Sequence, residues 1–163
     1  MQPIKEVVLE KTYDAPIEKV WQAWTQPEML KHWWGPDNVT IPKCEINLGI
    51  PGKFYIVMQA RKEMGSYAGV SWPMLAEFTE IIPNKKIAYR AEAWVDGDKD
   101  ETTINQTTEI NFAKEEGENA KTKVTIKAAI YKTGPKAVMA IDGMQMGFTQ
   151  QLEKLNKFLT FNF

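Results

Sequence analysis

The chain has 163 residues, of which 44% are hydrophobic, and its 20 basic and 21 acidic residues leave a net charge of −1. This length and apolar content exclude a disordered chain and predict one domain over residues 1–163 with a buried core. The charge balance indicates no nucleic acid as a partner, and no stretch is long and apolar enough for membrane insertion. The first residues lack the apolar segment of a secretory signal, and Cys44 is the one cysteine, so we expect a cytoplasmic protein.

The first predicted elements are a strand and two short helices rich in tryptophan. Alternate residues from Val7 to Tyr13 are apolar, which predicts a strand, and Lys11 interrupts that apolar face. Pro16 suits the first turn of a helix, because its missing N–H would be unpaired there. We expect Asp14, just ahead of it, to accept free backbone N–H groups at the helix start.

A second helix is expected to begin at a capping box, because Thr25 and Glu28 have the Thr-x-x-Glu spacing. Gly35 and Pro36 end it, the glycine by allowing a left-handed turn and the proline by blocking further helix. His32, the only histidine, lies near this end beside two tryptophans. A polar surface residue is a simpler interpretation of it than a general base.

After Pro36 the pattern changes to the period of two that is typical of strands. The predicted strand segments are residues 39–48, 54–59, 67–82, 87–95, 104–112 and 124–130. Pro42 indicates an edge or an irregular start for the first of them. Asp96, Asp98 and Asp100 have the spacing of a calcium loop, but the required glycine and glutamate are missing, which favours a solvated hairpin turn.

Residues 135–160 have apolar positions every three or four residues and predict one long amphipathic helix. Consecutive strands joined by short turns pair antiparallel, and the apolar face of such a sheet needs a cover. The sequence therefore predicts an α+β fold, in which a curved antiparallel sheet grips a long C-terminal helix.

Several motifs give this chain a resemblance to a known family. They are Asp14-Ala15-Pro16, Val20-Trp21, Pro27-Glu28, Trp33-Trp34-Gly35-Pro36, Glu77 to Pro83, and Gly147-Phe148 through Leu155. These segments resemble the signature of the heat-shock-protein ATPase activator homologue family, although tryptophan is more usual there than Phe148. That family belongs to the START-like (SRPBCC) superfamily, and the resemblance implies one START-like domain with the helix-grip fold.

The resemblance also implies what such a domain does. Members include ligand carriers, stress-related proteins and cyclase-like enzymes, and helix-grip proteins leave a pocket between the sheet and the long helix. The true co-chaperone has an additional N-terminal domain that binds the chaperone. Because this chain opens at the first strand of the helix-grip domain, we do not expect it to be a chaperone activator.

Seven residues are candidates for the wall of this pocket. Methionine and aromatic side chains suit a poorly defined apolar ligand, and two polar residues on apolar strand faces could orient its polar or acidic group. The candidates are Lys11, Met58, Trp72, Tyr89, Gln106, Met144 and Phe148. The alternative is that the aromatic residues are ordinary core and that Lys11 or Gln106 lies at an edge or a bulge.

The leading hypothesis is non-catalytic binding of a small, apolar or amphipathic molecule, with no cofactor. One histidine and one cysteine do not make a zinc site. The first alternative is a cyclase- or hydrolase-like enzyme in which Glu80, Glu109 or His32 converge in the pocket. The second alternative is a chaperone-related interaction module. A homodimer formed through exposed Trp33 or Trp34 also stays open.

Overall fold

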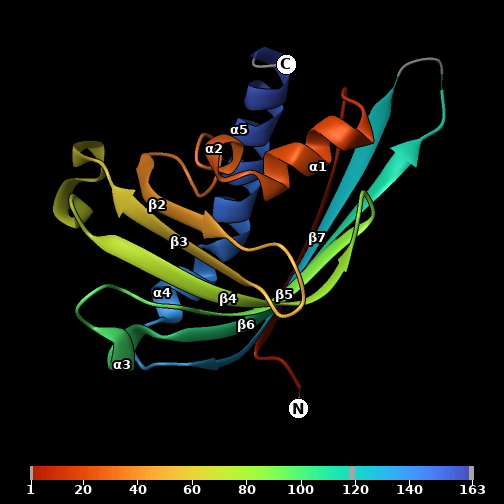
Figure 1. Cartoon of the computed structure of the whole chain (residues 1–163). Helices are drawn as coiled ribbons and strands as arrows, with labels where there is room; N and C mark the ends of the chain where they lie inside the picture. The colour runs from red at the N-terminus through yellow and green to blue at the C-terminus, as the bar shows by residue number, and fades with distance from the viewer. Residues whose placement is uncertain (1, 118–119, 162–163) are drawn as a thin grey trace.

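The computed structural model describes residues 2–117 and 120–161 and shows a curved seven-stranded antiparallel sheet with a long helix across its concave face (Figure 1). The strand order is β1-β7-β6-β5-β4-β3-β2, so the first and last strands of the chain lie side by side. The strands are β1 Lys5–Tyr13, β2 Val39–Ile46, β3 Lys53–Ala60, β4 Ser71–Ile82, β5 Lys86–Ala93, β6 Ile104–Glu115 and β7 Lys121–Thr133. The predicted α+β helix-grip fold is confirmed.

The helices are short except for the last one. They are α1 Ile17–Thr25, α2 Pro27–Leu30, the 3-10 segment η1 Lys62–Tyr67, α3 Lys99–Thr102, α4 Val138–Asp142 and α5 Met144–Phe161. The prediction of one continuous helix over residues 135–160 was wrong in one respect. The segment is divided at Gly143, which closes α4 by donating its N–H to the carbonyl of Met139 over 3.0 Å.

Both predicted N-terminal helix caps were wrong, and α2 ends at Leu30 rather than at Gly35 and Pro36. The backbone is still extended at Pro16, and no side chain caps α1, so Asp14 does not have that role. The hydroxyl of Thr25 donates instead to the carbonyl of Trp21 one turn earlier, at 2.8 Å, and Gln26 precedes α2. A threonine hydroxyl at the end of a helix can donate to a carbonyl of that helix or accept from an N–H at the start of the next one. Thr25 makes the first of these hydrogen bonds.

The strand predicted over residues 67–82 begins only at Ser71, because η1 and a turn occupy the residues before it. Two glycines with positive φ, Gly65 and Gly69, make this connection between β3 and β4 irregular. The irregular start of β2 is as expected, since its pairing with β3 shifts register between Thr40 and Lys43, around Pro42.

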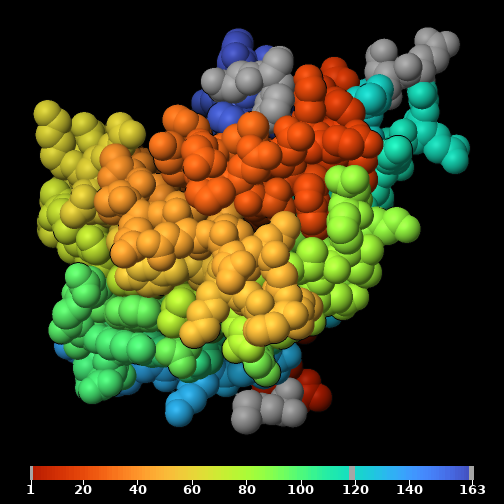
Figure 2. Space-filling view, in the orientation of Figure 1, coloured from red at the N-terminus to blue at the C-terminus, as the bar shows by residue number. Residues whose placement is uncertain are grey.

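The tryptophans of α1 and of the turn after α2 belong to the core or pack against it. Trp33 is fully buried and Trp34 is 6% exposed, and the rings of Trp24 and Trp33 meet edge to face with centroids 4.6 Å apart. The indole N–H of Trp33 donates to the carbonyl of Ala23, at 3.1 Å. A homodimer through exposed Trp33 or Trp34 therefore has no basis in this structure. Figure 2 shows the segment that carries them as a continuous layer of side chains over the front of the molecule.

Gly35 allows the chain to turn sharply after this aromatic layer. Its φ is +83°, and a methyl group added to it would lie 2.7 Å from the Met58 sulfur and 3.0 Å from a Val39 methyl. The turn therefore needs a glycine both for its backbone conformation and for the space around it.

We expect Gly35→Ala to destabilise the fold by about 1 kcal/mol more than Gly97→Ala. Both glycines have φ above +80°, so both alanines suffer the same backbone strain, but nothing lies within 4 Å of the Gly97 position. Urea unfolding of the two variants measures the difference. Equal losses of stability would show that the contacts with Met58 and Val39 do not limit residue 35.

Candidate functional site

The concave face of the sheet brings together the strand residues that the sequence singles out. Met58 lies opposite Trp72 in the pairing of β3 with β4, and Gln106 lies opposite Ala91 in the pairing of β5 with β6. Tyr89 is on the same face, opposite Phe78. Helix α5 crosses this face, and its inward positions include Met144 and Phe148.

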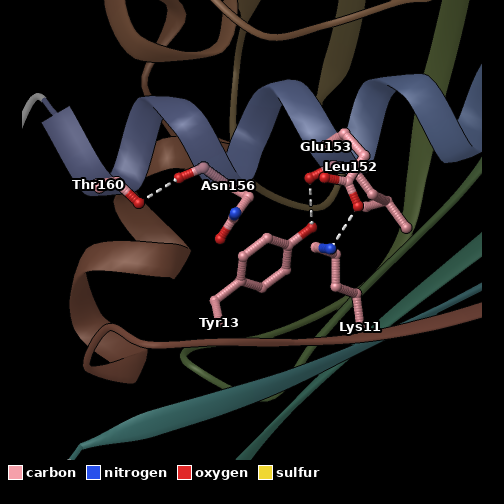
Figure 3. Close-up of polar contacts among 6 residues, drawn as sticks. All are labelled: Lys11, Tyr13, Leu152, Glu153, Asn156 and Thr160. Atoms are coloured by element: carbon pink, nitrogen blue, oxygen red, sulfur yellow. Dashed lines mark hydrogen bonds and ion pairs between the residues drawn. The ribbon is translucent and has the colours of Figure 1, made fainter.

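Strand β1 holds one side of α5 (Figure 3). The hydroxyl of Tyr13 donates to the carbonyl of Leu152 over 3.0 Å, and the ammonium of Lys11 pairs with the carboxylate of Glu153. Burial raises the pKa of Tyr13, so its hydroxyl remains a donor at any ordinary pH. Lys11 thus has a partner on the helix and is not a free cation in the interior.

The loop after α2 holds the other side of α5. The N–H of Gly35 donates to the Gln151 side-chain oxygen at 2.8 Å. The Lys154 ammonium donates to the carbonyls of Trp34 and Pro36, at 3.1 and 3.0 Å. Burial lowers the pKa of Lys154, and the two carbonyls supply the hydrogen bonds that its charged form needs. These contacts hold the middle of the helix against the loop after α2.

Tyr89 belongs to the closed end of the concave face. Its ring lies edge to face with Phe54 and Phe78, at centroid distances of 5.8 and 6.4 Å, and it is 3% exposed. The interior space beside these rings, which Trp24 also lines, has a volume of about 10 Å³. That is no more room than one water molecule needs, so the structure gives Tyr89 a packing role.

The other end of the concave face is packed less completely. Four large side chains there are only partly buried: Met58, Trp72, Met144 and Phe148. Met144 packs against a small apolar cluster that includes Ile104 and Ile130, separate from the main core. Phe148 is one turn further along α5, and Gln151 is the next inward residue.

Gln106 lies between the main core and this small cluster. It pairs with Ile130 of β7 directly after a register shift between Asn105 and Gln106, as the bulge alternative expected. It is 9% exposed, and its side-chain nitrogen is 3.9 Å from the sulfur of Met74. Thioether sulfur is a weak acceptor, so this contact replaces little of the hydrogen bonding that the amide has in water. We call Met58, Trp72, Met74, Gln106, Met144 and Phe148 the seam.

The sequence pattern did not single out Gln151, although its position gave a signal. It is three residues after Phe148 and four before Leu155, so it is a polar residue on the inward face of the helix. Its side-chain oxygen accepts from Gly35, and its side-chain nitrogen has no hydrogen-bond partner within residues 2–117 and 120–161.

The residues considered for catalysis do not converge. Glu80 and Glu109 lie on the outer face of the sheet, where both pair with Lys86, at 3.0 and 2.8 Å. The hydrogen bond from Lys86 lowers the pKa of Glu109, which keeps this carboxylate ionised. His32 is exposed and its ring stacks on Phe158, with centroids 5.7 Å apart. The three residues proposed for the enzyme alternative therefore do not share a pocket.

The remaining motifs have structural explanations. The aspartate-rich turn contains the short helix α3, and Asp98 pairs with Lys136 at 3.4 Å. Within the described part of the chain, no three histidine, cysteine, aspartate or glutamate side chains come together as metal ligands. Among its helices, none has the length and apolar content needed to cross a bilayer.

A depression of about 430 Å³ lies on the opposite, convex face of the sheet, and the sequence did not indicate it. It is lined mainly by outward-facing residues of the central strands and of β7, among them Leu75, Arg90, Glu92, Thr107 and Tyr131, and Gln106 also contributes to its lining. It is broad and open, and its charged groups of both signs partly pair with one another, as Arg90 does with Glu77 at 3.6 Å.

Comparison with known proteins identifies the family. The model of the Activator of Hsp90 ATPase homolog 1-like protein family matches residues 14–160. The chain belongs to this family. No curated protein matches the chain.

Solved structures of several bacterial proteins have the same fold. A protein from Nitrosomonas europaea is 23% identical, with a TM-score of 0.72 over 95% of this chain and 94% of its own. A protein from Staphylococcus epidermidis is 25% identical, with a TM-score of 0.70 over 98% of this chain and 94% of its own. One from Chromobacterium violaceum is 18% identical, with a TM-score of 0.68 over 94% of this chain and 96% of its own. These likenesses support the helix-grip architecture of the family.

Cys44 is expected to react slowly with iodoacetamide. Burial raises the pKa of this thiol to about 11, and Glu28 and Glu45 add to the effect. Because the thiolate is the reactive form, alkylation at pH 8 should be roughly a hundredfold slower than for an unhindered cysteine, and the rate should rise about tenfold per pH unit up to that pKa. Mass spectrometry of the alkylated protein measures it. Rapid labelling at pH 8 would contradict the burial of Cys44.

Proposed function

We propose that this protein binds a small, largely apolar molecule at the seam and does not catalyse a reaction. The observation that carries the proposal is the position of Gln106, a buried amide between two apolar clusters, with a sulfur atom as the partner of its nitrogen. Ligand sites are mainly apolar and have a few polar groups that fix orientation, and the seam has this composition.

The partly buried side chains of the seam supply the apolar surface for such a ligand. Met58 and Met144 have three rotatable bonds before the terminal methyl group, so they can move aside for ligands of different shape. Trp72 and Phe148 offer flat rings for contact. The closed core around Tyr89 then acts as the rigid floor against which the ligand is held.

The dispersion of Glu80, Glu109 and His32 supports a binding role over a catalytic one. General acid–base catalysis needs side chains within hydrogen-bond reach of one reacting group. The two carboxylates are held by Lys86 on the far side of the sheet, and the histidine is at the surface.

We expect N-phenylnaphthylamine, a neutral fluorescent probe, to bind at the seam and gain fluorescence. At about a hundred times its Kd, the probe should stabilise the fold by about 2.7 kcal/mol and raise the Tm by roughly 5–10 °C. Phe148→Ala should weaken binding by about tenfold or more, because it removes a large contact surface.

Met146→Ala is the matched control for that variant. Met146 is on the same helix two residues earlier and is 68% exposed, so its truncation should leave the affinity unchanged. A probe that neither gains fluorescence nor raises the Tm would contradict the proposed function. Equal effects of the two alanine variants would place the binding somewhere other than the seam.

A second candidate function is interaction with a heat-shock chaperone, in keeping with the family description. The observation that favours it is the exposure of three apolar side chains, those of Val138 and Met139 on α4 and of Met146 in the first turn of α5. Large exposed apolar patches mark interaction surfaces, and these side chains are candidates for one. Stimulation of Hsp90 ATPase activity by the wild-type chain, lost in Met139→Lys, would support this function.

A further inference from the structure

We infer that the ligand of the seam is a neutral molecule that presents a hydrogen-bond acceptor, such as a ketone, ester or amide carbonyl, to Gln106 and Gln151. This inference rests on the proposed function and adds the chemical class of the ligand. It rests on the orientation of one buried amide, the environment of another, and the charges around them.

The orientation of the Gln151 amide is fixed by Gly35. A backbone N–H can bond only to an acceptor, so the side-chain oxygen of Gln151 must face Gly35, at 2.8 Å. The side-chain nitrogen therefore points elsewhere. It lies in a residue that is 3% exposed, and it has no hydrogen-bond partner in the described ranges 2–117 and 120–161.

A short chain of contacts connects this amide with that of Gln106. Gln151 bonds to Gly35, and the Cβ position of Gly35 is 2.7 Å from the sulfur of Met58. Met58 is on the concave face of β3, next to the position that pairs with Met74 on β4. The sulfur of Met74 is the contact of the Gln106 side-chain nitrogen. Met58 and Met74 are on one face of adjacent strands, two positions apart in register, so we infer that the two donors approach this methionine pair, one from the helix and one from the sheet.

Both groups offer N–H donors, so they select a ligand atom that accepts. A buried donor without a good partner loses the hydrogen bonds that it has in water, and a carbonyl oxygen placed between the amides would restore them. An apolar ligand without an acceptor would fill the space and leave both donors unpaired. The seam should therefore discriminate in favour of the carbonyl.

The charges around the seam disfavour an anionic ligand. The two lysines that take part in the contacts of α5 already have partners. Lys11 pairs with Glu153, and Lys154 donates to the carbonyls of Trp34 and Pro36. A carboxylate at the seam would be buried against neutral donors alone, which costs more than two amide hydrogen bonds return. The sequence analysis allowed the ligand to carry either a polar or an acidic group. The charges around the seam favour a neutral polar group.

The test uses three naphthalene derivatives that carry an ethyl, an acetyl or a carboxylate group at the same ring position. They have nearly the same shape, and only the acetyl compound is both neutral and an acceptor. We expect the acetyl compound to bind roughly tenfold more tightly than the ethyl compound, and the carboxylate most weakly, in calorimetric titrations at pH 8.

Two variants assign this preference to the amides. Gln106→Met and Gln151→Met remove a donor and keep the side-chain length, so each should reduce the preference for acetyl over ethyl to about threefold or less. The affinity for the ethyl compound should be retained. Gln145→Met makes the same change at an exposed position of α5 and should leave the preference intact. Should loss of the Gly35 contact unfold Gln151→Met, Gln106→Met decides the question, because the contact of its amide nitrogen within the described part of the chain is the weakly accepting Met74 sulfur.

The outcomes separate this inference from the proposed function. Binding of the ethyl compound as tightly as the acetyl compound would overturn the neutral-acceptor inference and leave the apolar site standing. Tight binding of the carboxylate, or an unchanged preference in Gln106→Met, would also overturn it. If none of the three compounds binds, both the inference and the proposed function fail.

Discussion

The anchoring of α5 across the concave face is the constraint on which the rest of the structure depends. The apolar face of α5 alone would hold the helix against the sheet, but it would not fix the position of the helix along its own axis. Two directional contacts fix that position, the Tyr13 hydroxyl on the carbonyl of Leu152 and the Gly35 N–H on the amide of Gln151. Gly35 can reach the helix because its φ of +83° turns the chain after the buried tryptophans.

These anchors divide the interior into two parts with different properties. Between the anchors and the C-terminal end of α5, the helix closes over a dense core that includes Leu155 and Leu159. Toward Met144 the chain is interrupted at Gly143, and the cover consists of separate side chains and a small second cluster. A site that admits a ligand needs this second kind of packing, while the first kind supplies the stability that holds the site in place.

The sequence predicted the fold well because its signals are periodic and local. The alternation along β5, β6 and β7 and the motif around Trp33 and Gly35 were sufficient for the sheet, the helices and the family. The alternation along β6 indicated the face of Gln106, whereas both faces of β3 are apolar, so alternation alone did not decide the face of Met58. The caps, the break at Gly143 and the pairing of Lys11 did not follow. Thr25 and Gly143 each bond to a carbonyl four residues earlier, a local alternative that the residue types also allow, and Lys11 pairs with Glu153, which is distant in sequence. Gln151 was missed because its partner, Gly35, is distant in sequence.

The two buried amides are better explained as groups that recognise a ligand than as packing groups of the core. A leucine or methionine would fit the inward face of α5 or the concave face of β6 without leaving an amide nitrogen poorly bonded, and such a change often stabilises a core. The oxygen of Gln151 has a structural use in holding Gly35, but its nitrogen has no hydrogen-bond partner among the described residues, and the contact that they give the Gln106 amide nitrogen is a sulfur atom. Departures from good core design are expected where a protein binds something. Gln106 on β6 and Gln151 on α5 depart from it in this way, so the residues that weaken the packing are the ones that we propose bind a neutral ligand.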